Sequence, residues 1–241
     1  MKNLETETIL QIIQNHKRII IKNSDYDLTD EQEYNRHSKL ISGLAKNYLR
    51  REFRDFVFDE HNRQIFRFLA YYFNGCELAE SVFPNENYKI NKNLLLIGRV
   101  GTGKTLTMQI FADYLKFTQN KNQFLNVSQT QMMNYQKIHG HIDFFTFNEI
   151  NSKKFEGNPY NICLNDIGLE TEAQKSYGTS LDTVIDEFLY ARYEIYQQQN
   201  IKYHLTSNLN VDDFKKRFGN RLIDRFKSFN ILIFDGASRR M

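Results

Sequence analysis

One stretch, residues 94–105, limits the possible folds of this chain more than any other. It reads LLLIGRVGTGKT, and its last eight residues follow the pattern G-x-x-x-x-G-K-S/T. That pattern is typical of a loop that binds the phosphates of a nucleoside triphosphate, provided that a strand precedes it and a helix follows it. An apolar run precedes the loop, and apolar residues recur at spacings of three and four after it, from Leu106 to Leu115. The stretch therefore predicts a strand, a phosphate loop and a helix in succession.

Each residue type in the loop has a chemical reason. The glycines let the backbone turn tightly and bring N–H groups close to phosphate oxygens. The helix that begins near Gly103 directs the positive end of its dipole at the same anion. Lys104 would place a positive charge at the β- and γ-phosphates, and the Thr105 hydroxyl would ligate Mg²⁺. The predicted phosphate-binding residues are Gly98, Arg99, Val100, Gly101, Thr102, Gly103, Lys104 and Thr105.

The composition excludes several other classes of protein. The 32 basic and 29 acidic residues nearly balance, so the global charge does not require a nucleic-acid partner. Cys76 and Cys163 are far apart, which argues against a zinc site and a disulfide framework. No apolar run approaches the roughly 18 residues that span a bilayer, and no signal-peptide pattern follows Met1. We therefore expect a soluble cytoplasmic protein that acts without a membrane.

The chain divides into a helical N-terminal region, residues 1–85, and an α/β region, residues 86–241. Apolar stripes predict helices around residues 9–13, 40–49 and 65–73. The polar side of the second helix carries a basic cluster, which is either a solvated face or a contact for nucleic acid or a partner protein. The cluster consists of Lys46, Arg50, Arg51 and Arg54. We expect the N-terminal region to dock a partner.

Strands alternate with helices in the second region, which predicts a three-layer α/β fold with a mainly parallel sheet covered on both faces. Ligands of such sheets bind beyond the carboxyl ends of the strands. Asn165 and Asp166 end one expected strand, and Asn208 follows another. Asp166 is a candidate for catalysis and for Mg²⁺, and Asn208 could bond the γ-phosphate or the attacking water. Arg225 is a candidate arginine finger, and Arg240 a candidate phosphate sensor.

Five motifs occur in the order seen in DnaC/IstB-type AAA+ ATPases, and residues 85–241 resemble that family. They are the loop at 98–105, the turn at 165–168, the strand end at 206–209, the segment at 219–226 and the closing residues 238–240. The family contains replicative helicase loaders and transposition ATPases, without a separate lid domain. The resemblance implies a P-loop NTPase fold of the AAA+/ASCE type that binds ATP and Mg²⁺. It also implies that Asn208 is a first sensor, Arg225 a finger that reaches a neighbouring subunit, and Arg240 a second sensor.

One departure from the family concerns Asn165. The family usually has two consecutive carboxylates here, the first for Mg²⁺ and the second for the attacking water. Asn165 offers Mg²⁺ a carbonyl oxygen without charge and is a weaker ligand. Asp166 then keeps the catalytic role or serves the metal instead. We predict tight ATP binding with slow hydrolysis, unless the local register or Glu170 compensates.

The leading functional hypothesis is an ATPase that loads or remodels a replicative helicase or a related DNA machine during DNA replication. ATP would bind at the interfaces of a homo-oligomer, and single-stranded DNA is a candidate partner. Two alternatives stay open. One is an IstB-like transposition ATPase that coats duplex DNA. The other is a nucleotide-gated adaptor that scarcely hydrolyses ATP and acts by binding alone.

Overall fold

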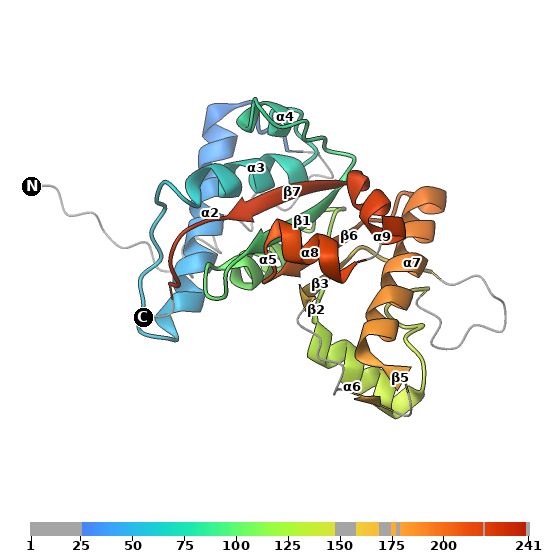
Figure 1. The fold of residues 1–241 in the computed structure, drawn as a ribbon. Coiled ribbons are helices and arrows are strands. Elements are labelled where there is room, and N and C mark those ends of the chain that lie inside the picture. Colours follow the sequence, from blue (N-terminus) through green and yellow to red (C-terminus); the bar gives the residue numbers. More distant parts are fainter. Residues whose placement is uncertain (1–25, 148–157, 169–174, 177–178, 219, 240–241) are drawn as a thin grey trace, which may run out of the picture. The chain divides into compact units, whose positions relative to one another are not determined.

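The structure, a computed structural model, describes residues 26–147, 158–168, 175–176, 179–218 and 220–239. The chain forms two compact units, which are described separately (Figure 1). The first comprises Met1–Pro84 with Ile110–Gln123, and the second comprises Asn85–Gln109 with Phe124–Met241. The sequence had placed residues 110–123 with the α/β region. The expected helix around residues 9–13 lies outside the described residues.

The first unit is helical. Its elements are α2 (Glu31–Arg50), α3 (Arg63–Phe73), α4 (Ala79–Val82) and the second part of α5 (Lys104–Phe117). Asp30 caps α2 by accepting a hydrogen bond from the backbone N–H of Glu33. The aromatic stripe of α3, from Phe66 to Phe73, is buried. The helices predicted over residues 40–49 and 65–73 are therefore confirmed, and the first of them begins earlier than expected.

A buried polar network stabilises the first unit around Tyr114, a residue of α5. The Tyr114 hydroxyl lies 2.5 Å from His37 Nδ1 and accepts a hydrogen bond from Asn74 Nδ2 at 2.7 Å. Asn120 Nδ2 donates in turn to Asn74 Oδ1 at 2.9 Å. Burial raises the pKa of the Tyr114 hydroxyl. These bonds satisfy polar groups that would be costly to bury unpaired.

The second unit contains a parallel five-stranded sheet. The order across the sheet is β2 (Leu125–Ser128), β3 (Ile162–Ile167), β6 (Tyr203–Ser207), β1 (Asn93–Gly98) and β7 (Phe229–Phe234) (Figure 1). All four pairings are parallel, as expected. A separate pair, β4 (Lys175–Ser176) and β5 (Thr179–Ser180), is antiparallel. The mainly parallel α/β fold is confirmed.

Further helices of the second unit lie between its strands in sequence. They are α6 (Gln129–His139), α7 (Leu181–Gln199), α8 (Val211–Arg217), α9 (Asn220–Arg225) and a short 3₁₀ turn at Phe226–Ser228. A capping box between Ser128 and Gln131 starts α6, and Gly140 ends it in the left-handed conformation. Asn210 caps α8 through the N–H of Asp213.

His204, the second residue of β6, is a core residue. Its ring is 1% exposed, and Nδ1 accepts a hydrogen bond from the backbone N–H of Leu94 at 3.2 Å. The ring of Phe124 packs edge-on against it. Burial lowers the pKa of His204 well below its usual value, because the charged form would lose its hydration. The side chain is therefore neutral near pH 7 and belongs to the packing of the sheet.

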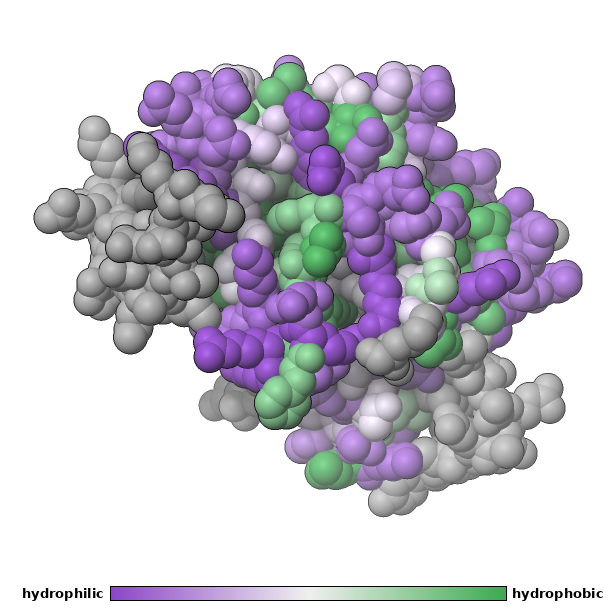
Figure 2. All heavy atoms as spheres, turned by 90° about the vertical axis from the view of Figure 1, so that its left-hand side faces the viewer, coloured by the Kyte–Doolittle hydropathy of each residue, from purple (hydrophilic) through white to green (hydrophobic). Residues whose placement is uncertain are grey.

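Figure 2 shows a face on which hydrophilic side chains predominate and hydrophobic ones occur in small groups. No helix within the described residues is long and apolar enough to cross a membrane. In the predicted basic cluster, Lys46 and Arg50 lie on α2 and are exposed. Because α2 ends at Arg50, Arg51 and Arg54 lie in the loop after it, where Arg51 is exposed and Arg54 pairs with Glu52. Their placement fits a solvated surface.

We expect the stability of the protein to rise between about pH 8 and pH 10 and to fall above that. Burial lowers the pKa of Lys202 from 10.5 to about 8, so the unfolded chain binds more protons in this window and unfolding becomes harder as the pH rises. Burial raises the pKa of Tyr88 and Tyr160 from 10.0 to about 12. The unfolded chain therefore loses these protons first above pH 10. Urea midpoints measured across this range test the prediction, and Lys202→Met should remove the initial rise.

Candidate nucleotide-binding site

The candidate site lies at the carboxyl ends of three neighbouring strands of the second unit. The loop at 98–103 follows β1 and leads into α5 at Lys104, as the sequence predicted. Asp166 lies near the end of β3, and Asn208 directly follows β6. Because β6 lies between β1 and β3, its end places Asn208 between the loop and Asp166. Residues more than 100 positions apart in sequence are thereby brought together.

Lys104 is 3% exposed and its ammonium group is surrounded by oxygens. Nζ donates to the carbonyl oxygens of Gly98 at 2.7 Å and Arg99 at 2.9 Å, and to Asn208 Oδ1 at 2.8 Å. A buried ammonium group is tolerated only with such partners. These oxygens accept hydrogen bonds from the same N–H groups that would bind a phosphate, so Lys104 must exchange partners when a phosphate binds.

Thr105, Asp166 and Asn208 form a connected group beside Lys104. The Thr105 hydroxyl lies 3.3 Å from Asp166 Oδ1 and 3.4 Å from Oδ2. Asn208 Nδ2 donates to Asp166 Oδ1 at 3.1 Å, while its Oδ1 accepts from Lys104. A hydroxyl and a carboxylate are the hard oxygen ligands that Mg²⁺ prefers. The donor set therefore fits a magnesium ion bound to a triphosphate.

An irregularity in β3 aims Asp166 at this group. The register of β3 against β6 shifts between Leu164 and Ile167, and Asp166 has a positive φ of 65°. Such bulges turn a side chain out of the regular alternation of a strand and are common near active sites. The backbone N–H of Asp166 donates to Thr206 Oγ1 at 2.9 Å, which holds the irregular turn in place.

Asn165 lies in a different environment from Asp166. It is 2% exposed, and Nδ2 donates to Asn126 Oδ1 at 2.7 Å and to the carbonyl oxygen of Val127 at 3.1 Å. Its Oδ1 accepts a weak hydrogen bond from Thr206 Oγ1 at 3.4 Å. The structure therefore places Asn165 between β2 and β6, where it links strands. Thr206 Oγ1 links it to the backbone of Asp166, and the role of Asn165 at the metal stays a prediction.

Replacing Asn165 by Asp should destabilise the protein. The carbonyl of Val127 is a fixed acceptor, so a carboxylate would lose a donor and bury a charge against oxygens. We expect Asn165→Asp to lower the free energy of unfolding by about 1–3 kcal/mol. Urea denaturation measures this change. Asn161→Asp is the matched control, because Asn161 uses its side-chain oxygen as an acceptor for the N–H of Lys202 and Asp would retain it.

The segment after β7 contacts the phosphate loop. The backbone N–H of Arg239 donates to the carbonyl oxygen of Gly101 at 2.9 Å. Gly101 has φ of +85°, and a Cβ there would lie 2.2 Å from Ser238 Oγ. Glycine is thus required both by the backbone conformation and by the close approach of Ser238. Arg240, the predicted second sensor, lies outside the described residues.

Arg225, the predicted finger, packs within its own unit. Its guanidinium lies over the rings of Tyr190, at 4.2 Å from the centroid, and Tyr193, at 4.7 Å, both on α7. Its Nη1 is buried and has no hydrogen-bond partner within the described part of the chain. A finger must reach a neighbouring subunit, so this side chain would have to leave the tyrosines to do so. The finger role stays a prediction.

Arg225→Ala should lower the free energy of unfolding by about 0.5–2 kcal/mol through the loss of stacking on the tyrosines. A finger would add a loss of about 10³–10⁵ in hydrolysis rate. Chemical denaturation and ATP turnover per folded molecule separate the two effects. Lys227→Ala, which removes an exposed cation paired with Asp224, is the control. Unchanged stability would contradict the stacking role.

A cleft of about 590 Å³ opens beside the loop. It lies at the carboxyl ends of β1, β6 and β7, and its volume falls within the roughly 300–1,000 Å³ of small-molecule sites. The lining residues are Ile97, Gly98, Arg99, Asn208, Leu209, Asn210, Val211, Asp213, Ile233, Phe234, Asp235 and Gly236. The cleft is therefore large enough for the nucleoside part of a nucleotide whose phosphates lie on the loop.

Two hydroxyl residues of β6 support the site, a role that the sequence analysis had not given them. Thr206 Oγ1 accepts from the N–H of Asp166, and Ser207 Oγ donates to the carbonyl oxygen of Ile167 at 2.8 Å. Ser207 Oγ also accepts from the N–H of Leu209 at 3.2 Å, which supports the turn that carries Asn208. Their position directly before Asn208 is the sequence feature that could have indicated this supporting role.

No family model and no curated protein matches the sequence. Solved structures to which it is similar include a protein of Streptococcus pyogenes serotype M3 described as a primosome component, at 16% identity and a TM-score of 0.47, covering 75% of this chain and 83% of that one. A DnaC helicase loader is 15% identical with a TM-score of 0.45, and the match covers 75% of this chain and 93% of that one. AMPPCP-bound DnaA from Aquifex aeolicus is 16% identical with a TM-score of 0.47, and the match covers 75% of this chain and 48% of that one.

The strand order of this chain decides its fold class. One strand, β6, lies between the phosphate-loop strand β1 and the acidic strand β3. The fold is that of a P-loop NTPase, with a parallel sheet, a phosphate loop after β1 and Asp166 near the end of β3.

Proposed function

We propose that this protein binds ATP with Mg²⁺ on the loop at 98–105. The observation that carries the proposal is the connected group of Lys104, Asn208, Asp166 and Thr105 at the ends of β1, β3 and β6. Lys104 would bind the β- and γ-phosphates, and Thr105 and Asp166 would hold the metal. Magnesium, when bound, would neutralise phosphate charge and orient the γ-phosphate. The choice of ATP over GTP rests on the family resemblance.

We propose that ATP hydrolysis is slow. Asp166 is the carboxylate bonded to Thr105, and a residue that serves the metal cannot also activate the attacking water. Asn165, at the neighbouring position, is neutral and bonded between strands. Asn208 bridges Lys104 and Asp166, so it is placed to sense the γ-phosphate. Arg225 of a neighbouring subunit, as the finger, and Arg240, as the second sensor, would complete the site in an ATP-bound homo-oligomer.

The cellular role that we propose is loading or remodelling a replicative helicase or a related DNA machine in the cytoplasm. Support comes from the order of the five motifs in the sequence. The helical first unit would dock the partner, and the ATP state of the second unit would control release of the partner and of single-stranded DNA. An IstB-like transposition ATPase is the alternative on the same motifs. The pairing of Asp166 with a neutral Asn165 favours a third candidate, a slowly hydrolysing adaptor.

Titration of purified protein with ATP, with and without Mg²⁺, tests the proposed binding. Magnesium-dependent binding supports it, and absence of any affinity for adenine nucleotides overturns it. Single-turnover hydrolysis with and without single-stranded DNA then separates a loader, which we expect to be stimulated, from an adaptor, which would not respond. Filaments on duplex DNA in the presence of ATP would favour the transposition alternative.

A further inference from the structure

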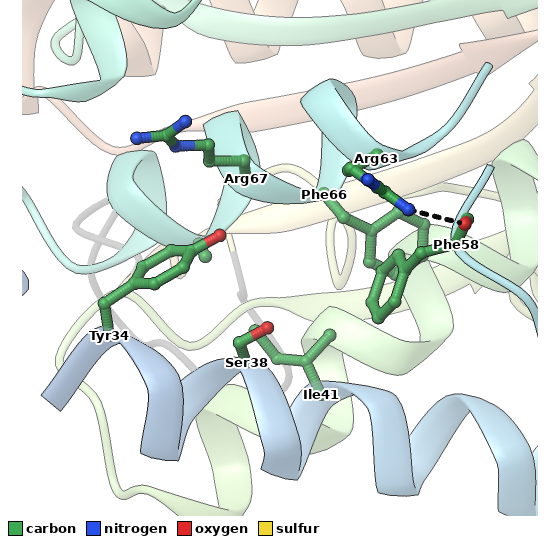
Figure 3. A pocket seen from close by; sticks show the side chains of 8 residues that line it. Tyr34, Ser38, Ile41, Phe58, Arg63, Phe66 and Arg67 are labelled. Atoms are coloured by element: carbon green, nitrogen blue, oxygen red, sulfur yellow. Dashed lines mark hydrogen bonds between the residues drawn. The ribbon is translucent and has the colours of Figure 1, made fainter. Parts of the chain in front are cut away.

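The first unit contains a pocket that the nucleotide chemistry does not use. It lies between α2 and α3, is closed on one side by the loop at 51–62, and has a volume of about 270 Å³ (Figure 3). Tyr34 and Ser38 project into it from α2, while Arg63 and Arg67 come from α3. The full lining consists of Tyr34, Ser38, Ile41, Phe58, Arg63, Phe66, Arg67 and Ala70.

Two arginines give this pocket a positive rim. Arg63 and Arg67 are four residues apart, so they lie on one face of α3, and both are exposed. Arg63 Nη2 donates to the carbonyl oxygen of Phe58 at 3.2 Å, and Arg67 lies over the ring of Tyr34 at 5.9 Å. None of the acidic side chains in the described residues forms an ion pair with either guanidinium. The lining contains no carboxylate. Arg67 also lies 5.7 Å from the centroid of the Tyr71 ring, and its side-chain contact with Tyr71 raises the pKa of the guanidinium. Both guanidinium groups keep these neutral partners and lack a carboxylate partner among the described side chains.

The floor of the pocket is apolar. Ile41, Phe66 and Ala70 are buried there, and Phe58 packs edge-on against Phe66 at 5.4 Å between ring centroids. A ligand therefore meets apolar surface below and guanidinium groups above. Arginine and aromatic residues are the types enriched at the centres of protein interfaces.

The loop that closes the pocket also exposes apolar side chains. Phe53 is 99% exposed and has a positive φ of 55°, an uncommon conformation for a bulky residue, and Val57 is 63% exposed. A fully exposed phenylalanine stabilises nothing in the folded chain and contributes energy only when another molecule covers it. Both residues lie on the loop that supplies Phe58 to the pocket, and neither is among the residues that line it.

Size and charge limit the class of ligand. The volume is below the range of about 300–1,000 Å³ typical of cofactor sites, so a side chain fits better than a nucleotide. Nucleic acid requires a row of cations along its phosphates. The pocket lining offers only two cations, Arg63 and Arg67, which is too few for such a row. A peptide with one or two carboxylates beside an apolar side chain meets both the arginines and the floor.

We propose that this pocket is the docking site for an acidic segment of a partner protein, in which Asp or Glu adjoins an aromatic or aliphatic residue. The carboxylate would bond Arg63 and Arg67, and the apolar side chain would enter between α2 and α3. Guanidinium–carboxylate pairs can be bidentate, which gives such a contact direction as well as charge. The inference rests on the proposed function for the identity of the partner as part of a DNA machine; the chemistry of the pocket does not depend on it.

The test uses the full chain and two synthetic probes. One is acetyl-Gly-Asp-Asp-Phe-Leu-Gly-amide, and the other carries Asn in place of both Asp residues. Heteronuclear NMR titration gives the two affinities. We expect the acidic peptide to bind at least about fivefold tighter, as two ion pairs at a partly exposed site allow. Arg63→Gln with Arg67→Gln should abolish this preference, and Arg63→Lys with Arg67→Lys should keep part of it.

Arg50→Gln is the matched control, because Arg50 is an exposed arginine of the same unit that does not line the pocket. It should leave the preference intact. The proposal is overturned if the two peptides bind equally well, or if Arg50→Gln reduces the preference as much as the double Gln variant does. It is also overturned if the double Gln variant loses affinity for a short oligothymidylate but not for the acidic peptide. Lys104→Ala separates the two proposals: it should weaken ATP binding and leave the peptide preference unchanged, so either can fail without the other.

Discussion

Lys104→Ala should lower the affinity for ATP with Mg²⁺ by about 10–150-fold. A hydrogen bond from a charged donor is worth about 1.5–3 kcal/mol, which corresponds to that range of affinity. Lys104 is a buried ammonium group of the loop that donates to Gly98, Arg99 and Asn208, and it would exchange these partners for phosphate oxygens. Isothermal titration calorimetry of the wild type and the variant measures the change.

The control for this prediction lies on the same helix. Lys116, in the last turn of α5, is exposed, and Lys116→Ala removes the same charge without touching the loop. We expect ATP affinity within about twofold of the wild type for this variant, since screened surface charges contribute little at this distance. An equal loss in both variants, or none in Lys104→Ala, would show that the loop does not bind the phosphates.

Asp166→Asn should reduce hydrolysis by about 10–100-fold or more and remove the dependence of ATP binding on Mg²⁺. Changes to groups that hold a metal typically have effects of this size. Asp166 presents both carboxylate oxygens to the Thr105 hydroxyl, and the variant keeps the shape of the side chain while losing its charge. Affinity for ATP in the presence of a chelator should change much less. Titrations with and without Mg²⁺, followed by single-turnover assays, measure both effects.

Asp224→Asn is the matched variant, because Asp224 is exposed and pairs only locally, with Lys227. It should leave both nucleotide binding and hydrolysis unchanged. If Asp166→Asn retained its magnesium dependence while Asn165→Asp altered it, the roles that we give to these neighbouring residues would have to be exchanged.

The fold of the second unit was predictable because its local signals agree. The apolar run at 94–97 and the glycines of the loop predicted the boundary between β1 and α5 that the structure shows. Strand order was not contained in these signals. It results from how five separate strands pair, and only the family resemblance pointed to it.

The site was predictable to the level of its loop, Asp166 and Asn208, and less so beyond them. A regular strand would point Asn165 and Asp166 to opposite faces, and the sequence does not reveal the bulge that turns Asp166 toward Thr105. The stacking of Arg225 on two tyrosines was equally hidden, since Tyr190 and Tyr193 lie more than 30 positions earlier in the chain. Both depend on packing between distant segments.

The pocket of the first unit was missed for a related reason. The sequence drew attention to the dense basic cluster of α2, whereas the two arginines of the pocket stand singly among the aromatic residues of α3. Their meeting with Tyr34 and Phe58 depends on how α2, α3 and the intervening loop pack. The density of charge in the sequence thus pointed to an exposed surface and not to the pocket, which contains only two separate arginines.

The bond between Arg239 and Gly101 ties the phosphate loop to the last described residues of the chain. The peptide group of Gly101 therefore cannot rotate toward an arriving anion without straining or releasing that bond. Ordering of the residues that follow β7 is thus thermodynamically coupled to ordering of the loop, so a change in one alters the other. We therefore expect a peptide fused after β7 to weaken nucleotide binding.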